Sequence, residues 1–249
     1  MIRARSISVR LGHPARRVLD GVDASLERGR IVAIVGRNAA GKTTLLRALA
    51  GLVAPAAGDV TWDGQSPARW GARERARRIA YVAQRPSLSA RFSVRDTIAL
   101  GRYALPPSDA RITSATRAFG LGAIAERIYQ ELSVGQQQRV ALARAWAQVD
   151  PDGALLLDEP FAAMDLAETD RCARLLRQHA RGGGLVALVL HDLNLAARLA
   201  DEVVVLDQGR MVAAGALRPI LTAEFLSVHF GVPFRLDADG VPEPILGGS

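Results

Sequence analysis

Three short apolar runs, separated by segments of helical periodicity, constrain the fold of this chain most strongly. They occupy residues 31–35, 154–157 and 185–190, and all are far shorter than the ~20 residues needed to cross a bilayer. Continuous apolar runs of this length are typical of buried parallel strands. Because the predicted strands alternate with helices, the sequence indicates an α/β fold with a mainly parallel sheet.

A mostly helical block interrupts this alternation at about residues 88–148. We therefore predict one domain spanning residues 1–249, with a core of about 1–87 and 149–249 and an inserted helical subdomain of about 88–148. A helix is expected over residues 42–52, with leucines on one face. A β-hairpin is expected where Asp207, Gln208 and Gly209 separate two apolar stretches.

Composition narrows the functional class. Hydrophobic residues make up 49% of the chain and charged residues 23%, so a substantial core can form. No apolar signal-peptide region occurs in residues 1–10, and the single cysteine, Cys172, permits neither an internal disulfide nor a CxxC metal site. We expect a soluble cytosolic protein. Its net charge is +7, and we interpret the basic cluster at residues 73–78 as a solvated helix face rather than a nucleic-acid patch.

Lysine is almost absent from this chain. Of the 32 lysines and arginines, only Lys42 is a lysine. A mutational bias toward arginine codons explains such a composition. Under that bias, a surviving lysine also suggests a position where the broad guanidinium cannot replace a compact ammonium.

Lys42 lies within a match to the phosphate-binding pattern G-x-x-x-x-G-K-[ST], between a predicted buried strand and an amphipathic helix. Backbone N–H groups of such a loop bind anionic oxygens, the lysine reaches the β- and γ-phosphates, and the hydroxyl of Thr43 coordinates Mg²⁺. The alternative is a plain strand–turn–helix connection. The loop residues are Gly36, Arg37, Asn38, Ala39, Ala40, Gly41, Lys42 and Thr43.

Two adjacent acids follow the second apolar run. Asp158 and Glu159 stand at the carboxyl end of a predicted parallel strand, the edge at which ligands bind in such sheets. We assign Asp158 to Mg²⁺ and Glu159 to accepting a proton from the attacking water. The alternative is a strand that simply ends in polar residues at a turn.

Two further polar residues end predicted strands. His191 follows the third apolar run and is a candidate contact to the γ-phosphate, although a lone histidine in such a place is commonly structural. Gln84 follows the strand predicted at residues 79–82 and is a candidate ligand of Mg²⁺ or water through its amide, the alternative being an exposed glutamine.

The order of these motifs resembles that of the nucleotide-binding subunit of an ATP-binding cassette (ABC) transporter. Residues 132–139, LSVGQQQR, are similar to the family's LSGGQ signature, Gln84 to its Q-loop, Asp165 to its D-loop and His191 to its switch histidine. The resemblance covers nearly the whole chain. It implies a RecA-like P-loop NTPase core with an N-terminal antiparallel β portion and an inserted α-helical subdomain.

The resemblance also implies a mechanism and partners. Two subunits associate head to tail, and each ATP with its Mg²⁺ lies between one P-loop and Ser133 and Gly135 of the partner subunit. Membrane permease subunits join this dimer on the cytoplasmic face of the inner membrane, where the chain is peripheral. An extracytoplasmic substrate-binding protein acts indirectly, and no nucleic acid is expected.

The resemblance assigns site residues by role. The implied catalytic residues are Glu159, His191 and Gln84. The implied metal ligands are Thr43, Gln84 and Asp158. The implied nucleotide-binding residues are the P-loop residues Gly36 to Thr43 together with Thr44, Ser133, Gly135, Gln136 and Asp165.

Several positions depart from the family pattern. Ala39 replaces a glycine, so we expect strain of ~1 kcal/mol if its φ is positive. Arg37 replaces a proline, and Val134 replaces the first glycine of the signature, which puts a bulkier side chain at the dimer seam. Leu11 stands where an aromatic residue usually stacks on adenine, with His13 as a weak substitute.

Residues 94–103, 191–198 and 220–232 are similar to those of bacterial importers of siderophores, haem and cobalamin. We therefore predict an ATPase that powers iron-chelate import, with a siderophore or haem as the expected cargo and cobalamin as the next candidate. The alternatives are a zinc, manganese or oxyanion importer, a weakly hydrolysing regulatory subunit, and a soluble ABC ATPase acting on nucleic acid. The last usually carries coiled-coil insertions or a second cassette, and this sequence has neither.

Overall fold

The structure, a computed structural model, describes residues 1–245 and divides into two compact units. The first unit comprises Met1–Ala68 and the chain from Ala187 onward, and the second comprises Arg69–Val186. Both contain strands and helices, which confirms the predicted α/β class. Among the described residues, no helix is long and apolar enough to span a membrane.

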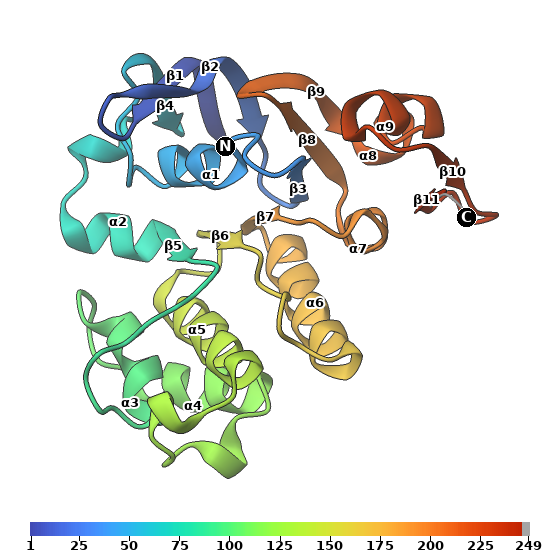
Figure 1. Ribbon diagram of the computed structural model, residues 1–249. Helices are drawn as coiled ribbons and strands as arrows, with labels where there is room; N and C mark the ends of the chain where they lie inside the picture. Colours follow the sequence, from blue (N-terminus) through green and yellow to red (C-terminus); the bar gives the residue numbers. More distant parts are fainter. Residues whose placement is uncertain (246–249) are drawn as a thin grey trace. The chain divides into compact units, whose positions relative to one another are not determined.

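An antiparallel sheet begins the first unit, as the resemblance implied. It contains β1 (Ile2–Leu11), β2 (Arg16–Leu26) and β4 (Ala57–Trp62) in the order β2-β1-β4 (Figure 1). Alternate residues of β1 and β2 are buried, as expected where one face of an antiparallel sheet covers a core.

The buried strand that precedes the predicted phosphate loop also lies in this unit. This strand, β3 (Ile31–Gly36), is buried at every position and pairs in parallel with β8 (Glu202–Asp207). The antiparallel partner of β8 is β9 (Arg210–Ala216), which confirms the predicted hairpin. Gln208 and Gly209 form its turn with φ of 45° and 81°, the left-handed values that a two-residue hairpin loop requires.

Helix α1 (Lys42–Leu49) contacts β1, β2 and β3, and Figure 1 shows it beside the antiparallel sheet. Its apolar face is buried, as predicted, but the helix does not continue to Leu52. It ends at Leu49, whose carbonyl oxygen accepts a hydrogen bond of 2.9 Å from the Trp62 indole nitrogen, and Gly51 then turns the chain with φ of 70°. The prediction of a helix over residues 42–52 was therefore too long, and Leu52 is exposed.

Short elements complete the first unit. They are the helices α7 (Leu193–Leu199), α8 (Leu217–Ile220) and α9 (Ala223–Phe230) and the antiparallel strands β10 (Phe234–Leu236) and β11 (Pro242–Pro244). The orange-to-red segment of Figure 1 contains α8, α9 and these two strands.

In the second unit, β5 (Ile79–Val82) pairs in parallel with β6 (Ala154–Asp158). Helix α2 (Ala72–Arg78) precedes β5 and has no buried residue, which confirms that the basic cluster lies on a solvated helix. The chain leaves β6 through α6 (Leu166–Arg181) and enters β7 (Leu185–Val189), within which it passes into the first unit.

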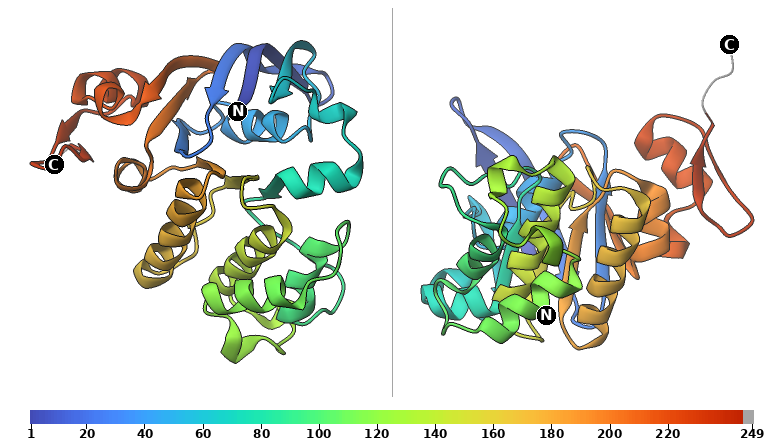
Figure 2. Two further views of the ribbon diagram at one scale, coloured as in Figure 1. Left: turned by 180° about the vertical axis from the view of Figure 1, so that it is seen from behind. Right: turned by 90° about the horizontal axis from the view of Figure 1, so that it is seen from below.

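Helices fill the block in which helical periodicity was predicted. The main ones are α3 (Val94–Ala99), α4 (Asp109–Ala118) and α5 (Val134–Gln148), joined by short 3₁₀ turns. They contact one another and lie side by side in Figure 1 and in both views of Figure 2. Gly101 allows this packing, because a Cβ there would overlap the carbonyl oxygen of Arg144 on α5.

A buried histidine ties several elements of the second unit together. The ring nitrogen Nε2 of His179, on α6, lies 2.9 Å from the carbonyl oxygen of Gly153, just before β6. The ring packs against Trp146 of α5, and Gly184 leaves room for it because a Cβ there would overlap the imidazole. Burial lowers the pKa of His179, while the Gly153 carbonyl and Asp152 oppose this shift.

We expect this histidine to make folding sensitive to acid. Because its pKa is lower in the folded state, the unfolded chain binds the proton more readily, and the free energy of unfolding falls as pH drops below the ordinary value of about 6.5. Denaturant titrations at several pH values should show a smaller acid-dependent loss for His179→Gln than for the wild type. An equal loss in the two proteins would contradict this role, and His13→Gln, at an exposed position, is the control.

Candidate functional site

The predicted phosphate loop connects β3 to α1 in the first unit. Gly41 has φ of 100°, a backbone conformation that favours glycine, and a Cβ on it would stand 2.7 Å from Leu19 Cδ2, so the leucine side chain would have to shift. Ala39 has φ of 62°, the positive value expected to cost an alanine ~1 kcal/mol. The loop therefore forms a curve, which is stabilised by a hydrogen bond of 3.2 Å from the Ala40 N–H to the Arg37 carbonyl oxygen.

Lys42 lies within this loop. The residue is only 6% exposed, and its Nζ donates hydrogen bonds to the carbonyl oxygens of Gly36 at 2.9 Å and Arg37 at 3.0 Å. The first turn of α1 contains no acidic residue, and Gly41 offers no side chain to cap its amides. A buried ammonium and the positive end of a helix dipole therefore meet at one place, an arrangement that binds anions.

A cavity of about 340 Å³ adjoins the loop. One wall is the loop and the other is the β8–β9 turn, whose Gly209 N–H donates to Ala40 O at 3.2 Å. The lining residues are Arg37, Asn38, Ala39, Ala40, Asp207 and Gln208.

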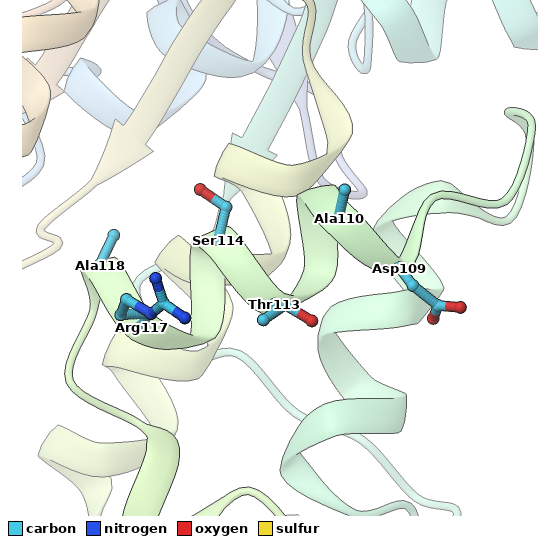
Figure 3. A pocket seen from close by; sticks show the side chains of 6 residues that line it. All are labelled: Asp109, Ala110, Thr113, Ser114, Arg117 and Ala118. Carbon is cyan, nitrogen blue, oxygen red and sulfur yellow. The ribbon is translucent and has the colours of Figure 1, made fainter.

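A second hollow, of about 480 Å³, lies on the surface of α4 (Figure 3). All of its lining side chains come from that one helix, and none is a predicted site residue. They are Asp109, Ala110, Thr113, Ser114, Arg117 and Ala118. We therefore do not assign the nucleotide to this hollow.

His191 belongs to the same unit as the phosphate loop. It is exposed and follows Leu190, whose N–H donates to Ile34 O of β3 at 3.2 Å. The next residue, Asp192, caps α7 by accepting hydrogen bonds from the Asn194 and Leu195 amides. His191 is thus brought beside the strand that leads into the loop.

The second unit brings the predicted acids and glutamine together. Asp158 is the last residue of β6 and is buried, and Gln84 follows the neighbouring parallel strand β5 by two residues and is exposed. Glu159 has φ of 49°, so a non-glycine residue is held in the left-handed region at this edge. Strained backbone of this kind is concentrated at functional sites.

Tyr81 was not identified from the sequence. Its hydroxyl donates a hydrogen bond of 3.4 Å to Asp158 Oδ2 from the adjacent strand. No motif marks this tyrosine, because the contact arises only when β5 pairs with β6.

Oxygen donors make up the candidate metal ligands. Among residues 1–245, no group of three or more histidines, cysteines or acids is arranged to hold a metal ion. The carboxylate of Asp158, the amide of Gln84 and the hydroxyl of Thr43 fit Mg²⁺, which uses few protein ligands together with water and phosphate oxygens. Burial raises the pKa of the Cys172 thiol to about 12, so this cysteine is not a candidate nucleophile.

The signature-like segment forms the start of α5. Ser133 caps the helix: its hydroxyl accepts from the Gln136 amide at 3.3 Å, and the Gln136 side chain accepts from the Ser133 amide at 3.1 Å. This reciprocal capping box fixes the helix N-terminus. Val134 is 65% exposed, and Gly135 is buried.

The start of α6 contacts the start of α5. Asp165 caps α6 by accepting a hydrogen bond of 2.7 Å from the Glu168 amide. The Glu168 carboxylate in turn lies 2.6 Å from the Arg139 guanidinium of α5. We did not predict the Arg139–Glu168 pair, although the Asp-x-x-Glu spacing at the start of α6 indicates a helix N-terminus.

Sequence comparison places these features among known proteins. A family model described as ABC transporter matches residues 19–162. The hemin import ATP-binding protein HmuV of Nocardia farcinica is 45% identical over 244 residues, which cover 94% of this chain and 84% of that protein.

Comparison with solved structures also finds ABC proteins. An inward-facing ABC transporter provisionally assigned to the metal-chelate type has a TM-score of 0.79 and 25% identity, with 98% of this chain and 97% of that chain covered. A dimeric post-hydrolysis structure of the ATP-binding cassette MJ0796 with ADP and Pi also has a TM-score of 0.79 and 25% identity. The aligned residues cover 88% of this chain and 99% of the MJ0796 chain.

Proposed function

This chain belongs to the ABC transporter family, and from that premise we propose that it hydrolyses ATP to drive import of an iron chelate, specifically haem. The observation that carries the cargo assignment is the 45% identity to a hemin import ATP-binding protein across 94% of the chain. The phosphate loop, with its buried ammonium, supports the nucleotide assignment independently.

ATP is held, in this proposal, by two copies of the chain arranged head to tail. The β- and γ-phosphates lie on the loop amides and Lys42 of one copy, and the capped start of α5 from the other copy closes over them. Dimeric solved cassettes of similar fold support this arrangement. The proposed nucleotide-binding residues are Gly36, Arg37, Asn38, Ala39, Ala40, Gly41, Lys42, Thr43 and Thr44, with Ser133, Gly135, Gln136 and Asp165.

Hydrolysis requires a metal, a base and a contact to the γ-phosphate that is transferred to water, with ADP as the leaving group. Thr43, Gln84 and Asp158 would hold Mg²⁺, which neutralises phosphate charge when bound. Glu159, whose backbone is fixed in an unusual conformation, accepts a proton from the attacking water, and His191 donates a hydrogen bond to the γ-phosphate. Tyr81 keeps the Asp158 carboxylate in place.

The proposal also covers the domain organisation of the chain and its position at the membrane. We propose a single nucleotide-binding domain over residues 1–249, with its catalytic core at about 1–87 and 149–249 and its helical subdomain at about 88–148. The subunit would be peripheral on the cytoplasmic face of the inner membrane, bound to permease subunits that receive cargo from an extracytoplasmic binding protein.

A reconstituted transporter tests the cargo. The chain and its permease, assembled in vesicles with the binding protein, should release phosphate from ATP and accumulate haem. Unlabelled haem should compete for uptake, whereas ferric siderophore, cobalamin and zinc should not. Haem uptake without competition by haem, or preferential uptake of one of the other cargoes, would contradict the assignment. Absence of phosphate release with the permease present would instead favour a regulatory subunit.

A further inference from the structure

Glu168 is seated between two residues of the signature helix that are one turn apart. Its Oε1 lies 2.6 Å from Arg139 Nη2, and its Oε2 lies 3.7 Å from where a Cβ on Gly135 would stand. The side chains of Arg139 and Glu168 are only 12% and 24% exposed. An arginine–carboxylate pair shielded in this way is short and strongly oriented.

A backbone contact reinforces the pair. Gly135 approaches Ala163 so closely that a Cβ on the glycine would overlap the Ala163 carbonyl oxygen. Ala163 lies in the short segment between Glu159 and Asp165, and this segment is folded on itself by Ala162 N–H to Glu159 O and Met164 N–H to Phe161 O hydrogen bonds. The start of α5 is therefore packed directly on the segment that begins at Glu159.

We propose that Arg139 and Glu168 are positioning residues that fix the start of α5 against this Glu159-bearing segment. The inference rests on the proposed head-to-tail dimer. In that dimer, Glu159 serves the ATP site of its own P-loop, while Ser133 and Gly135 serve the other site. The Arg139–Glu168 pair thus connects two parts of one chain that serve different ATP sites: the Glu159-bearing segment and the start of α5. Binding of ATP at one site therefore alters hydrolysis at the other.

The burial of this charged pair explains why removing either residue should disturb the packing of α5 on the Glu159-bearing segment. Arg139 Nε is buried and has no hydrogen-bond partner among the described residues, so the guanidinium depends on Glu168 for charge compensation. Removing one member leaves the other as an uncompensated, largely buried charge, which is costly. An exposed pair on the same helix α6, Arg174 with Asp170 at 69% and 61% side-chain exposure, provides a matched control.

The test uses the full chain assembled with its permease. Arg139→Gln and Glu168→Gln should each lower turnover at saturating ATP by about fivefold or more and move the Hill coefficient for ATP toward one. Binding of nucleotide to the isolated subunit should change by less than about twofold, since the P-loop is untouched. The double substitution should cost about as much as either single one, because the two residues act as a unit.

Arg174→Gln should match the wild type in turnover and Hill coefficient. Melting temperatures are recorded for each variant, and Glu168→Gln, which keeps side-chain length, decides the outcome if Arg139→Gln does not fold. Wild-type turnover and cooperativity in folded Glu168→Gln would overturn the inference while the dimer stands. Failure of Glu159→Gln to dimerise with Mg-ATP would refute the head-to-tail dimer of the proposed function and this inference together.

Discussion

Replacing Lys42 with arginine is expected to lower ATP binding and turnover by about 100-fold or more, although the charge is kept. Lys42 is 6% exposed and fits inside the loop by donating to two carbonyl oxygens at 2.9 and 3.0 Å. A planar guanidinium is broader and cannot occupy the same space without opening the curve of the loop. Titration of the purified chain with a fluorescent ATP analogue measures binding, and phosphate release measures turnover.

The same substitution separates two explanations of the composition. If codon bias alone explains the single lysine, Lys42→Arg retains near-normal turnover. Arg73→Lys, at an exposed position of α2, is the matched reverse exchange and should leave binding unchanged. A thermal melt of each variant shows whether any loss of binding reflects unfolding instead.

Replacing Glu159 with glutamine should trap an ATP-bound dimer and lower turnover by about 100- to 10,000-fold. Glutamine is similar in size and can adopt the φ of 49° found here, but its amide cannot accept a proton from water. ATP therefore still binds, and the closed state is no longer released by hydrolysis. Size-exclusion chromatography with and without Mg-ATP measures the dimer.

The control for this result is Glu126→Gln, which removes an exposed acid that is not among the proposed site residues. It should hydrolyse ATP and elute as the wild type does under both conditions. A Glu159→Gln protein that binds ATP but remains monomeric would count against the sandwich arrangement. A variant that keeps full turnover would show that another group is the base.

Features that depend on neighbouring residues could be predicted from the sequence. The strand–loop–helix around Lys42 and the β8–β9 turn at Gly209 were each predicted correctly. Their signals are local, because apolar runs, glycines and capping residues act within a few positions of one another. The end of α1 was predicted less well, because a distant side chain, Trp62, bonds to its last carbonyl.

The sequence by itself determined the chemistry: a phosphate-binding loop, acids at a strand end and a family signature can all be recognised from residue types and spacing. Only the tertiary structure decided which distant side chains support them. Tyr81 donates a hydrogen bond to Asp158, which lies 77 positions away in sequence on the neighbouring strand. Arg139 of α5 forms an ion pair with Glu168 of α6. Such contacts follow from how elements pack, and no local pattern encodes the packing of one element on another.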